Sequence, residues 1–261
     1  MVSTPSAAAP IRTLASKHLQ ENRHYQVLLP DSYHRSEFAL RHYPTVYLLD
    51  GQWHSALAWA VIQHLSASGW IPELILVAID TGSHRFRDLT PTASLLDWRG
   101  LRCESYRGSG GLRHFLGFMQ DELLPSLAAD YRTAPHRSLV GHSLGGLAVS
   151  HSLLTQPDFF QGLVSIDASL WWDQQHTVNE LASLAQAARG TTEQRYFYGW
   201  ANYPADDPQG LAVLAQSNRR FTAALQDKGS AAGELGVEYF DRVGVPAGLN
   251  GRPAICVCPS P

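Results

Sequence analysis

The chain has 261 residues and a mass of 28.7 kDa, and its 44% hydrophobic content is enough to bury one substantial core. A formal net charge of -3 and a pI near 6.4 leave no basic stripe for nucleic acid or for an anionic membrane surface. No stretch stays apolar for about 18 residues, and residues 1–10 lack the basic and apolar regions of a secretion signal. We therefore expect a soluble, cytoplasmic protein. Cys103, Cys256 and Cys258 have neither metal-site nor disulfide spacing and are expected to be free thiols.

Short runs rich in β-branched and aromatic residues predict strands, and helical patterns alternate with them. The predicted strands are 24–29, 45–50, 74–80, 138–141, 163–166, 195–199 and 237–240. The predicted helices are 55–66, 112–130, 146–155, 178–189 and 210–226. This alternation predicts an α/β protein with a mostly parallel central sheet and helices on both faces.

Two segments break the alternation. Residues 81–111 form a long loop rich in Arg, Gly and Ser after a central strand, where such loops line the rim of a site. The tail after Asp241 contains prolines and glycines that forbid the closing helix expected there. We therefore expect a flexible N-terminal tail at 1–12, an α/β domain at 13–241 and an atypical tail at 242–261.

Residues 141–145 read Gly-His-Ser-Leu-Gly, between a strand-like run and a helical pattern. The two glycines allow a sharp turn from strand to helix, and the turn exposes the hydroxyl of Ser143 beside a helix N-terminus. Ser143 is therefore a candidate nucleophile, and an accidental glycine-rich turn is the alternative. A serine nucleophile needs a base, which in this arrangement is a histidine near the C-terminus, yet the last histidine of the chain is His176.

Five blocks of sequence resemble the putative-esterase family of α/β-hydrolases, which includes esterase D and the enterobactin-type siderophore esterases. The most specific is the Ser-Leu-Trp-Trp stretch at 169–172, and the similarity runs from about Leu14 to Phe240. The resemblance implies an α/β-hydrolase fold with an atypical C-terminal segment. The five blocks are residues 47–53, 85–92, 109–115, 139–146 and 165–173.

The resemblance implies a nucleophile at Ser143 and an oxyanion hole made by the backbone amides of Leu144 and Gln52. Without it, residues 50–51 are equally well explained as an ordinary turn after a strand. The family places its acid after the strand at 195–199, where Asp206 and Asp207 stand at unusual spacing, so the acid stays unassigned.

Four further residues are candidates for substrate binding. Arg85 and Arg87 suit an anionic or catecholate-bearing substrate, or they are solvated loop charges or ion-pair partners. Trp171 and Trp172 can stack on an aromatic acyl group, or they pack as part of a wall. The remaining histidines lack metal-ligand spacing, so neither a metal site nor a cofactor is expected.

Taken together, the residues and the resemblance predict a serine ester hydrolase of the siderophore-esterase-like branch, which acts on a small-molecule ester through an acyl-enzyme at Ser143. Loss of the C-terminal catalytic histidine would impair it, and the tail after Asp241 has the character of a frameshift product. The alternatives are an acyltransferase of the same fold and a catalytically inactive ligand-binding homologue. The sequence leaves the oligomeric state open.

Overall fold

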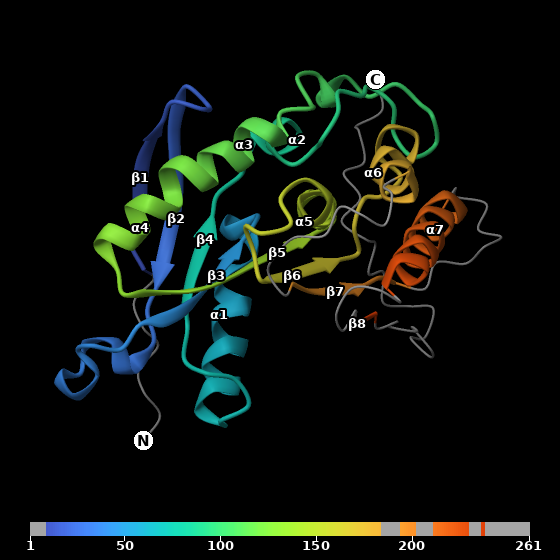
Figure 1. Cartoon of the computed structure of the whole chain (residues 1–261). Coiled ribbons are helices and arrows are strands. Elements are labelled where there is room, and N and C mark those ends of the chain that lie inside the picture. Colours follow the sequence, from blue (N-terminus) through green and yellow to red (C-terminus); the bar gives the residue numbers. More distant parts are fainter. Residues whose placement is uncertain (1–8, 184–193, 202–210, 230–235, 238–261) are drawn as a thin grey trace, which may run out of the picture. The chain divides into compact units, whose positions relative to one another are not determined.

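The computed structural model describes residues 9–183, 194–201, 211–229 and 236–237 (Figure 1). These residues belong to two compact units, which we describe separately. The first unit comprises Met1–Ser83 and His114–Leu139, and the second comprises His84–Arg113 and Val140–Pro261.

The strands of the first unit lie in the order β1, β2, β4, β3. β1 pairs antiparallel with β2, β2 pairs antiparallel with β4, and β3 pairs parallel with β4. All five residues of β4 are buried, which explains its uninterrupted apolar sequence Ile-Leu-Val-Ala-Ile. The bounds are β1 Ile11–Ser16, β2 Glu21–Leu28, β3 Tyr43–Leu48 and β4 Ile75–Ile79.

Helix α1 (Gly51–Ala67) follows β3 and packs mainly against β4. The helix predicted at 112–130 is interrupted, because α3 (Leu112–Phe118) and α4 (Leu124–Asp130) are separated by a π-helical turn at Met119–Leu123. Pro125, at the start of α4, has no N–H to donate to the preceding turn, and this accounts for the change of helical pitch before it.

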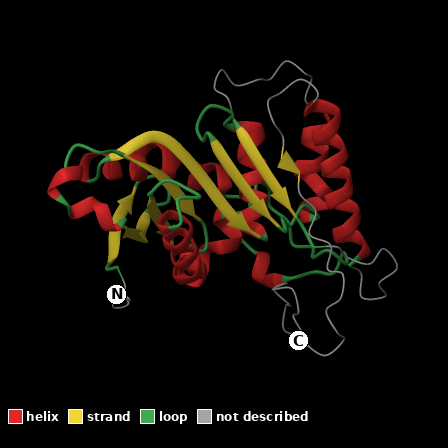
Figure 2. Cartoon of the chain, turned by 90° about the horizontal axis from the view of Figure 1, so that it is seen from below, coloured by secondary structure: helices red, strands yellow, loops and turns green. Residues whose placement is uncertain are grey.

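The second unit contains the end of β5 (Thr133–His142) and the parallel strands β6 (Gly162–Ile166), β7 (Arg195–Gly199) and β8 (Gly236–Val237). Helix α5 packs on β6, and α6 packs against both α5 and α7. In Figure 2 the helices are red and the strands yellow. The loop before α3 carries the short helix α2 (Arg85–Asp88). The longer helices are α5 Leu144–Thr155, α6 Trp172–Ser183 and α7 Ala212–Gly229.

The predicted α/β fold with a mostly parallel sheet is confirmed. The sequence patterns missed β1, because its first three residues are exposed and the strand lacks a clean apolar alternation. The tail at 242–261 lies outside the described residues, as do Asp206, Asp207 and most of the predicted strand at 237–240. The proposed division into tails and one domain stays a prediction.

Cys103 is buried and disulfide-bonded, so the prediction of three free thiols is wrong. Cys256 and Cys258 lie outside the described residues. Within the described ranges, no helix combines the length and the apolar character needed to cross a membrane. The cytoplasmic location stays a prediction.

Candidate active site

Ser143 occupies the turn between β5 and α5 in a strained backbone conformation, with φ 59° and ψ -116°. Positive φ is rare for a residue with a side chain and typically costs about 1–3 kcal/mol, so the surrounding structure must hold it. Close packing of the flanking glycines provides part of that hold. A Cβ on Gly141 would lie 2.3 Å from the carbonyl of Gly145, and one on Gly146 would lie 2.9 Å from the carbonyl oxygen of Ile166.

The loop after β6 clamps Ser143 from the other side. The Ser143 N–H donates to the Ile166 carbonyl at 3.0 Å, and the Ser143 carbonyl accepts from the Ser169 N–H at 3.0 Å. The two hydroxyl groups of Ser143 and Ser169 lie 3.3 Å apart, within hydrogen-bond distance. The clamping loop is strained in turn, since Asp167 has φ 47° and its N–H donates to the Gly199 carbonyl at the end of β7.

A buried hydroxyl cluster fixes α5 on the strands behind the turn. The Ser150 Oγ lies 3.0 Å from the Ser165 Oγ and 2.9 Å from the Tyr196 hydroxyl, and it donates to the Gly146 carbonyl at 2.8 Å. Burial raises the pKa of the Tyr196 phenol well above its usual range, so the cluster stays neutral. The cluster holds the helix that carries the turn and adds no charge beneath Ser143.

The two predicted oxyanion-hole residues lie in different units. Leu144 is the first residue of α5, where backbone N–H groups have no helical partner and a developing negative charge is favoured. The Gln52 side chain accepts a hydrogen bond at Oε1 from the Thr81 N–H, at 3.3 Å. Asp50, which precedes this loop in a left-handed conformation, accepts a short hydrogen bond from the Thr81 hydroxyl. The loop is thus fixed within its own unit, and the role of Gln52 stays a prediction.

The two arginines of α2 have different surroundings. Arg85 Nη2 donates to the carbonyl oxygen of His142, the residue before Ser143, at 3.5 Å. Arg87 Nε donates to Asp88 Oδ1 at 2.8 Å, and Asp88 is completely buried. The Arg87 guanidinium therefore balances a buried carboxylate, which favours the ion-pair interpretation, whereas Arg85 lies beside the backbone next to Ser143.

The two adjacent tryptophans also differ in burial and in contacts. Trp172 is 1% exposed, and its indole N–H donates to the Thr92 carbonyl at 3.0 Å. Its ring lies 5.0 Å from the buried Tyr106 ring, so Trp172 belongs to the core. Trp171 is less buried, and its ring meets the Trp98 ring edge to face at 5.9 Å. Trp171 therefore remains the member of the pair that is available to a ligand.

A left-handed turn follows the tryptophans. Asp173, Gln174 and Gln175 have φ values of 45°, 55° and 66°. A left-handed conformation costs roughly 1–2 kcal/mol per residue for L-amino acids, so three in succession are a substantial local strain. Such strain gathers at ligand clamps and active sites, and no feature of the sequence had indicated it here.

Two histidines, His151 and His176, lie beside the carboxylate of Glu180. His151 Nδ1 lies 3.2 Å and His176 Nε2 lies 3.3 Å from Glu180 Oε2. Burial lowers the pKa of His151, and the carboxylate of Glu180 partly opposes this effect. His151 is seven residues along α5 from Leu144, a rise of about 10 Å, too far for a hydrogen bond with Ser143. In the described part of the chain, the side chain hydrogen-bonded to the Ser143 hydroxyl is that of Ser169 and not a histidine.

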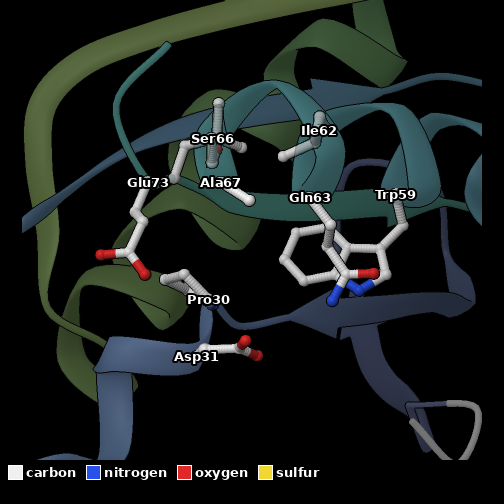
Figure 3. A pocket seen from close by; sticks show the side chains of 9 residues that line it. Pro30, Asp31, Trp59, Ile62, Gln63, Ser66, Ala67 and Glu73 are labelled. Atoms are coloured by element: carbon white, nitrogen blue, oxygen red, sulfur yellow. The ribbon is translucent and has the colours of Figure 1, made fainter. Parts of the chain in front are cut away.

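A separate cavity of about 150 Å³ lies within the first unit, between α1 and residues 30–31 and 73–74 (Figure 3). Trp59, Asp31 and Glu73 are among its lining residues. The Glu73 carboxylate accepts hydrogen bonds from the Ser32 hydroxyl and from Arg41 Nη1, so its charge is balanced by the protein itself. No group of three or more His, Cys, Asp or Glu side chains among the described residues is placed to hold a metal ion.

The chain is similar to several known proteins. The sequence profile of the family described as "Putative esterase" matches residues 16–231. The uncharacterized protein YbbA of Bacillus subtilis is 28% identical over 229 residues, covering 84% of each chain. The ferri-bacillibactin esterase BesA of Bacillus subtilis is 30% identical over 175 residues, and the alignment covers 63% of this chain and 59% of that relative.

The chain is also similar to a fungal protein and to a protein of known structure. The siderophore triacetylfusarinine C esterase of Aspergillus fumigatus is 25% identical over 204 residues, covering 70% of this chain and 65% of that one. The crystal structure of an IroE-like serine hydrolase from Shewanella oneidensis superposes with a TM-score of 0.76 and 32% identity. That superposition covers 89% of this chain and 72% of the other, so the described fold is also found in a serine hydrolase.

Proposed function

Because the chain belongs to the putative esterase family and is a carboxylic ester hydrolase by that membership, we propose that it cleaves siderophore-type esters with Ser143 as the nucleophile. The observation that carries this proposal is the strained conformation of Ser143 at the junction of β5 and α5. Support for the substrate class comes from two relatives, whose names give a ferri-bacillibactin and a triacetylfusarinine C esterase.

In this mechanism, the Ser143 oxygen attacks the ester carbonyl carbon and its proton passes to a general base. The Leu144 N–H at the start of α5 donates to the oxyanion of the tetrahedral intermediate, and we assign the second donor to the Gln52 backbone. Collapse of the intermediate releases the alcohol and leaves an acyl group on Ser143. Water then attacks the acyl-enzyme and frees the acid.

Among the described residues, no histidine is hydrogen-bonded to Ser143 to act as its general base. The last histidine is His176, which contacts Glu180 together with His151, and the Ser143 hydroxyl is bonded to Ser169. We therefore extend the proposal to the tail and infer that the sequence after Asp241 is a frameshift product. The contact of Ser143 with Ser169 instead of a histidine also favours a second candidate function, a ligand-binding homologue that keeps the site and has lost catalysis.

Substitution of the nucleophile tests the proposal directly. Ser143→Ala should abolish both hydrolysis of a nitrophenyl ester and labelling by a fluorophosphonate probe, with little change in stability. Ser66→Ala, a partly exposed serine of α1, is the matched control and should behave like the wild type. Labelling that persists undiminished in Ser143→Ala would place the nucleophile elsewhere, and turnover that rises with added alcohol would indicate an acyltransferase.

A second experiment compares this chain with one whose reading frame is restored after Asp241. Removing the base of a serine hydrolase typically costs on the order of 10⁴-fold in kcat or more, so the restored chain should be faster by a similar factor. Equal kcat/KM for the two chains would rule out the frameshift explanation.

A further inference from the structure

We propose that helix α1 is the contact surface of a homodimer, in which the exposed side of the helix packs against the same side of a second copy of this chain. The surface, which we call the α1 face, consists of Trp53, Ala56, Leu57, Ala60, Val61 and His64. All of these residues belong to the first unit. The inference is independent of the proposed function, because it assigns none of them to ester hydrolysis.

The α1 face is apolar and exposed. The helix packs mainly against β4, and Ile62 and Leu65 on its other side are only partly exposed. On the α1 face, by contrast, Trp53 is 62% exposed, Leu57 is 73% exposed and Val61 is 48% exposed. Residues four apart lie one above the other on a helix, so these three side chains form one continuous ridge. A contiguous apolar surface of this kind marks an interaction site.

The α1 face is also uncharged. Residues 51–72 contain no Asp, Glu, Lys or Arg, although these residues make up 16% of the chain. Two copies can therefore meet at this surface without like-charge repulsion, even though each carries a net charge of -3. A charged partner would find no group of opposite sign here, whereas a second copy presents the same neutral, apolar surface.

The shape of the α1 face is self-complementary. Trp53, Leu57 and Val61 form a row of large side chains at a spacing of four residues, and Ala56 and Ala60 form the neighbouring row. When two helices pack through rows of this spacing, the ridge of one lies in the groove of the other, at a crossing angle near -50°. A two-fold axis places the large row of each copy over the alanine row of its partner, so the assembly closes as a dimer.

The area of the α1 face sets the strength of the dimer. Its six side chains expose roughly 500 Å² per copy, so a dimer would bury roughly 1,000 Å², which is the lower limit for a specific interface. Interfaces of about 1,600 Å² already range from micromolar to picomolar in affinity. We therefore expect a Kd on the order of 10 μM and a dimer that dissociates on dilution.

A membrane surface is the other apolar partner that an exposed helix can have. Helices that lie on lipid surfaces carry Lys or Arg on their polar side, and these residues attract anionic lipid headgroups. Helix α1 contains neither residue, and its other side is packed on β4. The sequence of α1 therefore favours a second copy of the chain over a membrane.

Sedimentation of the full chain at concentrations of about 1–200 μM tests the proposal. The weight-average mass should rise with concentration from 28.7 kDa toward twice that value. Leu57→Glu should weaken association at least about 100-fold, because it buries a charge in each half of an apolar contact. The matched control is Leu40→Glu, which makes the same change at a leucine that is 93% exposed outside the α1 face. Its Kd should stay within about threefold of the wild type.

Two further variants test the packing of the rows. Ala60→Leu adds apolar area but fills the alanine row, so it should weaken the dimer about tenfold, whereas non-specific apolar association would become stronger. Trp53→Ala should also weaken the dimer, and Trp70→Ala, at an 81% exposed tryptophan beyond the end of α1, should not. Unchanged thermal unfolding by circular dichroism would show that these variants fold. A Kd that is unchanged or lower in Ala60→Leu would overturn the packing.

The homodimer is refuted by a mass that stays at 28.7 kDa up to about 200 μM, or by one that rises beyond twice 28.7 kDa. It is also refuted if a monomeric chain co-sediments with vesicles of phosphatidylcholine and phosphatidylglycerol and Leu57→Glu abolishes this binding. Ser143→Ala should dimerise like the wild type. A chain that dimerises but hydrolyses no ester would refute the proposed function alone, and a monomeric chain with esterase activity would refute this inference alone.

Discussion

Substitution of Gly141 by alanine should disrupt the turn that presents Ser143. The new Cβ would lie 2.3 Å from both the carbonyl carbon and the carbonyl oxygen of Gly145, and 2.9 Å from its Cα. Ordinary contacts begin near 3.4 Å, so β5 and the first turn of α5 would have to separate by about 1 Å. Overpacking of a well-packed site costs typically 1–3 kcal/mol and sometimes more, and the atoms involved here belong to the backbone, which cannot rotate away. We expect a loss of about 3 kcal/mol or more in the free energy of unfolding.

Urea unfolding followed by circular dichroism measures this change, and Gly117→Ala provides the matched control. A Cβ on Gly117 would meet the ring of His18 at 2.7 Å, but that side chain is 34% exposed and can move aside. Alanine also gains up to about 1 kcal/mol over glycine inside a helix, so this variant should stay within about 1 kcal/mol of the wild type. For a protein of this size, the loss in Gly141→Ala corresponds to a Tm lower by about 10 °C. An unfolding free energy for Gly141→Ala within 1 kcal/mol of the wild type, at an unchanged m-value, would refute the packing argument.

Three other outcomes follow from the site. Trp172→Ala should lower the free energy of unfolding by about 3–5 kcal/mol in urea titrations, whereas Trp171→Ala should cost far less and mainly raise KM for aryl esters; equal losses of stability would show that both tryptophans are core residues. Burial lowers the pKa of His151 in the folded state, so its contribution is fully present above the unfolded pKa of about 6.5 and is lost as the pH falls below it. His151→Gln should therefore lose less stability than the wild type between pH 7 and pH 5 in paired unfolding curves, and parallel curves would contradict this. Asp88→Ala should destabilise the protein by a few kcal/mol in the same assay, because it leaves Arg87 without its buried carboxylate, and a neutral result would remove that role.

Several elements were predictable because their signal is local. β7 begins and ends at the residues expected, and the turn at Ser143 lies between the predicted strand and helix, since glycine spacing and apolar runs are properties of adjacent residues. Pro125 shows the limit of such patterns. The helical periodicity continues across it, and only the missing N–H in a real helix produced the π-helical turn.

The α/β class, the family and the turn at Ser143 were predictable from the sequence, because each depends on short runs of adjacent residues. The three-dimensional structure was needed to show that Trp172 is buried, while Trp171 borders a cavity with Trp98, more than 70 residues earlier in the chain. It alone also showed that the Ser143 hydroxyl meets Ser169, and that His151 and His176 share Glu180. These outcomes depend on which distant segments pack together, and the free energy of that packing depends on the three-dimensional fit of side chains, which has no periodicity along the chain.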